Sequence, residues 1–322
     1  MKTVFSGIQP SGSVHLGNIL GALINWKRMQ EDYTCYYCIV DLHSLTTFPE
    51  KEILHQDKID TIKSLIAVGI DPGKSIVYFQ SDLPQHAELS WILSNFCQIG
   101  ELQRMTQYKD KSESFGTHAG LFTYPVLMAA DILIHKADEV PVGDDQTQHL
   151  ELTRDIATRF NQKYQEIFPI PSRNSTKTAA RVMSLRHPEA KMSKSSDDVA
   201  GTIYITDEDE EIMKKLKTSV TDSGSKISYD KQKKPGISNL LEILASIKGI
   251  SIEKTLDEVS EMQYGDFKIH VSKELISFLS PIREVYLGLT DKKILEISKE
   301  GSEKAKITAD ATLTEVKNCL GI

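Results

Sequence analysis

Apolar and polar residues alternate with two different periods along the first 80 positions of the chain. Short runs of branched and aromatic residues predict strands at 3–5, 34–40 and 76–79. Between these runs, apolar residues recur every three or four positions, which predicts helices that begin near Leu16 and cover about 52–68. Strands that alternate with helices favour right-handed crossovers and a parallel sheet covered on both faces. The pattern therefore predicts an α/β fold.

The remainder of the chain is predicted to be mostly helical. Residues 84–168 predict helices, 169–177 a loop and 181–185 a further strand. After Asp207, helical stretches are separated by Gly, Ser and Pro, as at Gly224. We therefore expect an α/β domain with a helical insertion, followed by a helical C-terminal domain.

The composition is that of a globular protein, with 322 residues of which 40% are hydrophobic and 26% charged. The longest apolar stretch, 120–134, is interrupted by Pro125 and Asp131, so no membrane span is predicted. The first seven residues lack the apolar core of a signal peptide. We expect a cytoplasmic protein that does not attach to a membrane.

The formal net charge of −7 argues against a constitutive nucleic-acid binder, because such proteins are usually basic. Local basic surfaces are still compatible with this charge. Lysines cluster at 214–217 and 231–234, where they form either solvated faces or contacts to nucleic-acid phosphates.

Two of the four cysteines, Cys35 and Cys38, have the spacing of a redox or zinc motif but fall within a predicted strand. Residues three apart on a strand lie about 10 Å from one another and point to opposite faces. A disulfide is excluded at that distance. No second Cys/His pair follows at zinc spacing, so we expect buried thiols.

The segment from Ser6 to Asn18 is predicted to leave a strand, pass through a loop with Gly7 and Gly12, and enter a helix. Unpaired N–H groups and the positive dipole end at a helix N-terminus suit a phosphate. His15 can donate a hydrogen bond to a phosphate oxygen. Glycines in an α/β loop also occur for purely structural reasons, so this string alone leaves both interpretations open.

A second string, Lys191-Met192-Ser193-Lys194-Ser195, places two lysines in a loop of small residues. Its ammonium and hydroxyl groups can stabilise charge that develops on a departing pyrophosphate. Together, the two strings predict a grip on a triphosphate from two sides.

A third string, Leu121 to Leu133, places Tyr124, Met128 and Asp131 at positions i, i+4 and i+7 of a predicted helix whose first turn begins at Pro125. A buried carboxylate needs a donor partner. That partner is either a ligand N–H or O–H or another protein group.

The fourth string, Val140 to Gln146, is a small-residue turn before an amphipathic helix that extends to Phe160. Its polar side chains can hold sugar hydroxyls or an ammonium group. Helix capping by Asp144 or Asp145 would explain the same residues.

In this order and spacing, the four strings resemble the tryptophanyl-tRNA synthetases, a family of class I aminoacyl-tRNA synthetases. The resemblance implies a Rossmann-type catalytic domain at 1–205, with a helical insertion at about 84–168 and a mobile loop at about 188–200. It implies a helical domain at 206–322 that binds tRNA and its anticodon. It further implies a homodimer that uses ATP and Mg²⁺ to form tryptophanyl-adenylate and then esterifies tRNA(Trp).

The resemblance also assigns roles to single residues of this sequence. The expected catalytic residues are His15, Lys191, Lys194 and Ser195. The expected ATP contacts are Gln9, Pro10, Ser11, Gly17, Asn18, Gly143, Asp144, Asp145, Val182, Lys191, Met192, Ser193, Lys194 and Ser195. The expected tryptophan contacts are Phe5, Val40, His43, Tyr124, Met128, Asp131, Val140, Val142 and Gln146. No protein ligand for a metal is implied, and Mg²⁺ comes with the nucleotide.

One position departs from the usual signature His-Ile-Gly-His, which here reads His15-Leu16-Gly17-Asn18. Asn18 can donate and accept hydrogen bonds but cannot carry charge. A charged-histidine role at that position is therefore excluded.

Tryptophan is favoured over tyrosine because an indole N–H only donates, so that one buried acceptor, Asp131, satisfies it. A phenol both donates and accepts, and Phe5 and Met128 supply no second polar group. The alternatives are a tyrosyl-tRNA synthetase, a small-molecule nucleotidyltransferase and a non-catalytic RNA-binding paralogue. Exchange of pyrophosphate into ATP that depends on tryptophan would separate them.

Overall fold

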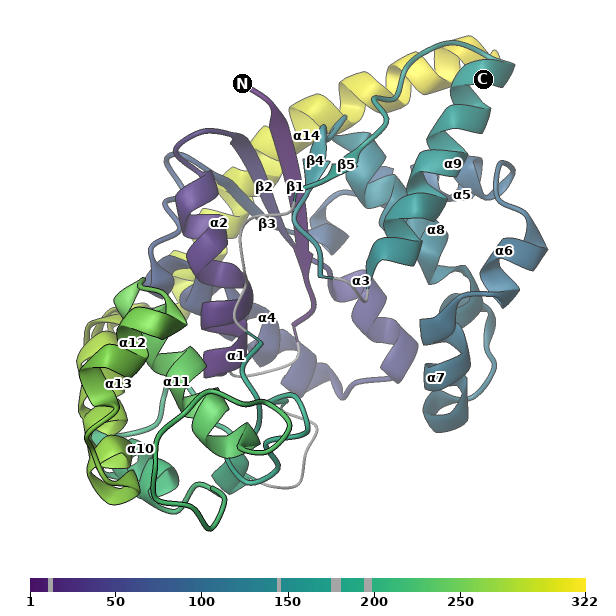
Figure 1. Ribbon diagram of the computed structural model, residues 1–322. Helices are drawn as coiled ribbons and strands as arrows, with labels where there is room; N and C mark the ends of the chain where they lie inside the picture. Colours follow the sequence, from purple (N-terminus) through teal and green to yellow (C-terminus); the bar gives the residue numbers. More distant parts are fainter. Residues whose placement is uncertain (11–13, 144–145, 175–180, 194–198) are drawn as a thin grey trace.

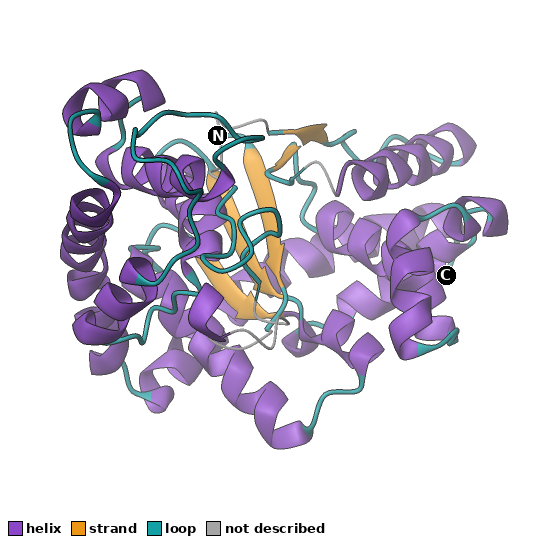
Figure 2. Ribbon diagram, turned by 60° about the horizontal axis from the view of Figure 1, so that its bottom comes forward, coloured by secondary structure: helices purple, strands orange, loops and turns teal. Residues whose placement is uncertain are grey.

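The computed structural model describes residues 1–10, 14–143, 146–174, 181–193 and 199–322. At its centre lies one parallel sheet with the strand order β3-β2-β1-β4-β5. The strands are β1 (Thr3–Ile8), β2 (Thr34–Ile39), β3 (Ile76–Phe79), β4 (Glu139–Val140) and β5 (Ser172–Arg173). Because all strands are parallel, their carboxyl ends meet at one edge, which Figure 2 turns toward the viewer. The predicted α/β fold is confirmed.

Helices cover both faces of the sheet (Figures 1 and 2). The helices of the described residues are α1 (Leu16–Asn18), the π-helical η1 (Ile19–Leu23), α2 (Ile24–Met29), α3 (Asp41–Ser44), η2 (Leu45–Thr47), α4 (Lys51–Val68), η3 (Gln80–Asp82), α5 (Gln85–Ser94), α6 (Ile99–Gln103), α7 (Thr106–Phe115), α8 (Ala119–Ile134), α9 (Thr147–Lys163), η5 (Val199–Gly201), α10 (Asp209–Lys217), α11 (Pro235–Lys248), α12 (Ile252–Val259), α13 (Tyr264–Gly288) and α14 (Asp291–Leu320).

Two hydrophobic clusters form, one on each face of the sheet. The first joins β1–β3 to α1, η1, α2, α4 and the C-terminal helices α10, α11 and α13. The second joins the opposite faces of the same strands to α5, α8, α9 and the second half of α14. Cys35 belongs to the first cluster and Cys38 to the second, and both are buried free thiols. The prediction that they point to opposite faces of one strand is confirmed.

Several local predictions were wrong. Strand β1 continues to Ile8, so that Gly7 lies in the strand rather than in a loop. Pro125 lies inside α8, which begins six residues earlier, at Ala119. Residues 181–185 form an isolated bridge from Met183 to Lys191 instead of a strand, whereas the predicted loop at 169–177 contains β5. Such short pairings depend on which segment lies alongside and not on local composition.

The last helix, α14, returns from the C-terminal helices to the sheet and packs along β3 (Figure 1). At the crossing, Gly301 lies directly on the backbone of Val77: a Cβ built there would lie 1.9 Å from the Val77 carbonyl oxygen. A glycine is therefore needed for this helix to approach the strand so closely. In the part of the chain that the structure describes, no helix is long and apolar enough to span a bilayer.

Replacing Gly301 with alanine should destabilise the protein by about 1–3 kcal/mol, because helix or strand must move to accommodate the methyl group. Urea unfolding of Gly301→Ala and the wild type would measure this change. Gly265→Ala is the matched control, because a Cβ at Gly265 in α13 meets no atom within 4 Å. The control should stay within about 0.5 kcal/mol of the wild type. Equal unfolding midpoints for the two variants would contradict the close approach.

Candidate active site

The first predicted phosphate-binding string enters the helical run of α1, η1 and α2 at the carboxyl end of β1. The backbone N–H of His15 donates to Oδ1 of Asn18 at 3.2 Å, which fixes the helix start. The segment is also tied to a distant one: Leu16 N donates to Ile203 O at 2.8 Å, and Ile205 N donates to Val14 O at 3.1 Å. These bonds hold the helix start against the segment that leads into α10.

The side chain of His15 is buried, with 7% exposed. Burial and, to a smaller extent, the charge of Lys191 together lower its pKa to about 4. The imidazole is therefore neutral at physiological pH. It can donate a hydrogen bond to an anion, but it adds no positive charge.

The second string lies directly beside the first. A Cβ on Gly17 would lie 2.9 Å from Cε1 of His15 and 3.7 Å from Cβ of Met192. Met192 is buried, and its backbone N–H donates to Val182 O at 3.0 Å. The fold thus brings together two strings about 175 positions apart in the sequence.

The segment around Val182, one of the expected ATP contacts, is anchored by the C-terminal half of the chain. Met183 N donates to Oδ1 of Asn239 at 2.9 Å, and Nδ2 of Asn239 donates back to Met183 O at 2.9 Å. Asn239 lies on α11 and is buried. A single carboxamide therefore fixes the backbone next to Val182.

Other expected nucleotide contacts lie on the same side of the molecule. Pro10 is buried and Gln9 is exposed just after β1, while the backbone of Ser193 accepts a hydrogen bond from Thr202 at 3.3 Å. Gly143 accepts from the backbone N–H of Gln146 at 3.1 Å. Five expected site residues lie outside the described residues: Ser11, Asp144, Asp145, Lys194 and Ser195.

The apolar residues expected around the substrate ring come together in one cluster. Phe5, Val40 and Val140 are buried in it, and Met128 and Val142 pack against it. They come from β1, the end of β2, β4, α8 and the turn after β4. A Cβ on Gly7 would lie 3.0 Å from the Val40 side chain and 3.7 Å from the Phe5 ring, so a glycine leaves room beside this cluster.

Asp131 lies on α8, with only 1% of its surface exposed. Its Oδ2 is 2.8 Å from Nε2 of His43. Its Oδ1 accepts from Nε2 of Gln80 at 2.7 Å and is 2.8 Å from Nδ1 of His86. Burial alone would raise the pKa of this carboxyl, but the contacts with His43 and His86 outweigh burial and lower its pKa to about 2. The group is an anionic acceptor held from three sides.

His43, one of the expected tryptophan contacts, has a further contact that was not expected: it is a hydrogen-bond partner of Asp131. Gln80 and His86 were not among the expected site residues. The sequence did contain an indication for Gln80, because this residue directly follows the buried strand β3. Polar residues at the carboxyl ends of parallel strands commonly line functional sites.

Two further expected tryptophan contacts, Tyr124 and Gln146, lie on α8 and directly before α9. The hydroxyl of Tyr124 is 2.7 Å from Nε2 of His149 and donates to Oε1 of Gln107 at 3.2 Å. Its ring meets His43 edge-on, with 6.1 Å between ring centroids. Gln146 precedes the first residue of α9.

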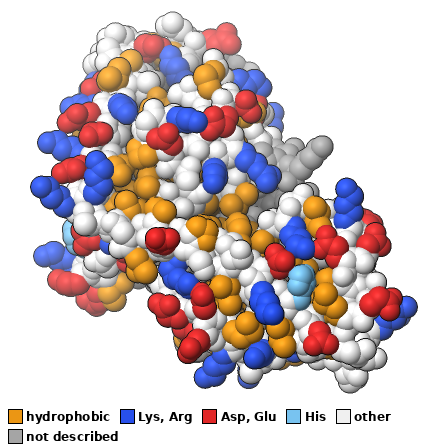
Figure 3. All heavy atoms as spheres, turned by 90° about the vertical axis from the view of Figure 1, so that its left-hand side faces the viewer, with side chains coloured by type: hydrophobic (Ala, Val, Ile, Leu, Met, Phe, Trp, Pro, Cys, Tyr) orange, Lys and Arg blue, Asp and Glu red, His pale blue; other side chains and the backbone are white. Residues whose placement is uncertain are grey.

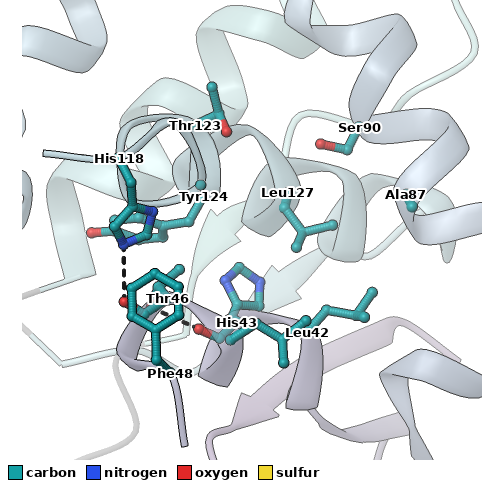
Figure 4. Close-up of a pocket in the computed structure, with 12 residues that line it drawn as sticks. Leu42, His43, Thr46, Phe48, Ala87, Ser90, His118, Thr123, Tyr124 and Leu127 are labelled. Atoms are coloured by element: carbon teal, nitrogen blue, oxygen red, sulfur yellow. Dashed lines mark hydrogen bonds between the residues drawn. The ribbon is translucent and has the colours of Figure 1, made fainter. Parts of the chain in front are cut away.

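A cavity of about 350 Å³ opens beside His43 and Tyr124 (Figure 4). Its remaining lining comes from α3, η2, α5 and α8, for instance Ala87 and Leu127, and from Phe48 directly after η2. Among the described residues, no group of three or more His, Cys, Asp or Glu side chains could hold a metal ion.

Comparison with known proteins agrees with this geometry. A family model described as tRNA synthetases class I (W and Y) matches residues 1–280. The tryptophan–tRNA ligase of Halalkalibacterium halodurans is 46% identical over 100% of this chain and 98% of its own length. The corresponding enzyme of Clostridium tetani is 45% identical over 99% of this chain and 96% of its own length.

Solved structures show the same similarity. The tryptophanyl-tRNA synthetase of Mycoplasma pneumoniae superposes with a TM-score of 0.89 at 34% identity, covering 100% of this chain and 98% of that one. The enzyme of Campylobacter jejuni, solved with ADP and tryptophan, gives 0.85 at 34% identity, covering 99% and 100%. The resemblance seen in the four strings is thereby confirmed, and the chain belongs to the class I tRNA synthetases of the tryptophan and tyrosine branch.

Proposed function

We propose that this protein is a tryptophan–tRNA ligase. It activates L-tryptophan with ATP, releases pyrophosphate and transfers tryptophan from the adenylate to the terminal ribose of tRNA(Trp). The proposal is supported by full-length relatives of that name and by the related structure solved with ADP and tryptophan. The observation that carries it is the anionic Asp131 beside a cluster of apolar side chains.

The hydrogen-bond capacity of Asp131 favours an indole. A carboxylate has about four acceptor positions. His43 occupies one position on Oδ2 and Gln80 one on Oδ1, and Nδ1 of His86 lies 2.8 Å from Oδ1 in poor alignment, which leaves a position open on Oδ2. One N–H donor fills that position, whereas a phenol would also need a donor that Phe5 and Met128 cannot supply. A phenyl ring would leave the carboxylate short of one hydrogen bond, which such sites reject strongly.

The activation step needs no protein base, because the attacking carboxylate of tryptophan is already an anion. One of its oxygens forms a bond to the α-phosphorus of ATP, and the bond from that phosphorus to the bridging oxygen breaks as pyrophosphate leaves. The role of the protein is then positioning and charge stabilisation. Lys191, with Lys194 and Ser195 outside the described residues, would stabilise the pyrophosphate, and neutral His15 would donate a hydrogen bond to a phosphate oxygen.

The nucleotide would lie between the two adjacent strings, with its adenine against the backbone at Val182 and its ribose at Gly143, Asp144 and Asp145. Gln9, Pro10, Ser11, Gly17 and Asn18 would contact it from the other side. Mg²⁺ would arrive as the ATP complex and neutralise phosphate charge.

The helices after residue 206 are proposed to bind the tRNA. Lys215 is unsuited to a phosphate contact, because it is buried and pairs with Asp207 at 2.6 Å. Lys214, Lys217 and Lys233 are exposed and stay candidates. On the face shown in Figure 3, the described residues mix basic with acidic side chains and form no broad basic area. Phosphate contacts there would be few and local.

The proposed homodimer would form on the face around the cavity of Figure 4. Phe48 is 70% exposed, Leu45 53% and Trp91 76%, and all three lie on elements that line or border the cavity. Ile99 on α6 and Phe115 on α7 are exposed as well. Exposed apolar side chains around one cavity favour an interaction face. A second copy of the chain is the occupant that we propose.

The proposed activity is tested by exchange of labelled pyrophosphate into ATP. Exchange should require tryptophan and should not occur with tyrosine. Lys191→Ala should slow adenylate formation by at least about tenfold, with tryptophan binding changed much less, because the lysine acts on the developing charge. Exchange with tyrosine, or with neither amino acid, would exclude the proposed function. Equal effects of Lys191→Ala on binding and rate would exclude the role of Lys191.

The role of Asp131 is tested with a substrate that lacks only the donor. In L-3-benzothienylalanine, sulfur replaces the indole N–H. The wild type should prefer tryptophan, and Asp131→Ala should lose roughly tenfold or more of this preference in kcat/KM. An unchanged preference would show that the ring does not contact this carboxylate.

The dimer face is tested by sedimentation velocity. Phe48→Glu should be monomeric at concentrations at which the wild type is dimeric, because a charge would be buried without a partner. Ile307→Glu is the matched control: Ile307 is 71% exposed on α14, away from the cavity lining. A monomeric wild type would contradict the dimer, and dimeric Phe48→Glu would contradict its location.

A further inference from the structure

A chain of buried polar groups continues from Asp131 to the C-terminal helix. Nδ1 of His86 lies 2.8 Å from Oδ1 of Asp131. The hydroxyl of Tyr78 lies between Nε2 of His86, at 3.0 Å, and Nε2 of His135, at 2.7 Å. Nδ1 of His135 lies 3.0 Å from Oγ1 of Thr308 on α14. The chain therefore links α8, α5, β3 and α14 through side chains alone.

These groups are shielded from water. The exposed fraction is 0% for Tyr78 and His86, 1% for Asp131 and 3% for His135. His135 is stacked on Tyr36, with 4.2 Å between ring centroids, and burial lowers its pKa well below the ordinary value. In such surroundings each proton needs an acceptor, since an unpaired buried polar group is costly.

The contact with Asp131 determines how His86 is protonated. Nδ1 must carry a hydrogen, because a ring lone pair 2.8 Å from an anionic oxygen would be repulsive. This contact is short but poorly aligned, and among the described residues Nδ1 has no better hydrogen-bond partner. The orientation of the ring is thus not set by Asp131 alone. It is set by Tyr78, which bonds the opposite nitrogen.

The Tyr78 hydroxyl couples the two imidazoles, because it lies within hydrogen-bond distance of Nε2 of both. Nδ1 of His135 is bonded in turn to Thr308, whose hydroxyl also donates to Ala305 O at 3.0 Å. Removal of the Tyr78 hydroxyl therefore takes one hydrogen-bond partner from each imidazole.

We propose that Tyr78 and His86 are positioning residues for the substrate-selecting carboxylate. They hold Oδ1 of Asp131 so that the remaining acceptor position on Oδ2 is directed at the N–H of the substrate ring. This inference rests on the proposed function, because it takes Asp131 as the indole acceptor. Neither residue touches the substrate; both act through the carboxylate.

The proposal predicts a specific defect in Tyr78→Phe. The ring still fills its place in the core, but His86 loses the partner of Nε2 and Asp131 loses its fixed orientation. The preference for L-tryptophan over L-3-benzothienylalanine in kcat/KM should fall roughly tenfold, because the hydrogen bond to a charged acceptor is weakened for the donor substrate alone. Pyrophosphate exchange with each amino acid measures this preference.

Tyr37→Phe is the matched control. Tyr37 is equally buried on the neighbouring strand, and its hydroxyl donates to Trp26 O at 2.7 Å in the cluster on the opposite face of the sheet. It should lose a comparable amount of stability while the substrate preference stays unchanged. Equal reductions with both substrates in Tyr78→Phe, or an equal change of preference in Tyr37→Phe, would overturn the proposal.

A pair of variants at His86 gives a second readout. The amide of His86→Asn can still donate toward Asp131, whereas His86→Leu cannot. The asparagine variant should retain more of the preference for tryptophan than the leucine variant, and equal losses would count against positioning. Failure of the proposed function would look different: the wild type would not distinguish the two amino acids, and Asp131→Ala would change nothing.

Discussion

A buried carboxylate constrains much of this structure. An ionised Asp131 among apolar side chains would be very costly without donors. His43, Gln80 and His86 supply them from α3, η3 and α5. These elements follow β2 and β3, so the connections after two strands must converge on one residue of α8. The packing of that face of the sheet and the charge of the site are therefore set by the same contacts.

The nucleotide side of the site depends on a different kind of contact. There, backbone segments far apart in sequence are joined by hydrogen bonds and by a close approach at Gly17. Asn239 on α11 holds the backbone at Met183, and the segment after Gly201 bonds to the start of α1. Movement of the C-terminal helices relative to the sheet would therefore alter the space between the two strings that are proposed to bind phosphate.

The helix α14 adds a third connection. Gly301 allows it to lie on the backbone of β3, and Thr308, two turns further along, reaches the buried polar chain that ends at Asp131. The C-terminal helix is thus part of the core beneath the proposed substrate pocket and not an appendage of the proposed tRNA-binding half. The proposed boundary at residue 206 divides the sequence into two parts, but in space α14 from the second part packs on the sheet of the first.

Local patterns were sufficient for the long elements and for the reactive strings. Apolar periodicity predicted α4, β2 and β3 nearly to the residue, and the strings at His15 and Lys191 pointed to a triphosphate. Such signals are local, because a period of two or 3.6 reflects which face of one element is buried. The donors to Asp131, the burial of Lys215 and the short strand β5 depended instead on the packing of distant segments. Which side chain pairs with a buried charge depends on which segments pack together in the folded protein. The residues next to that charge in the sequence do not determine this packing.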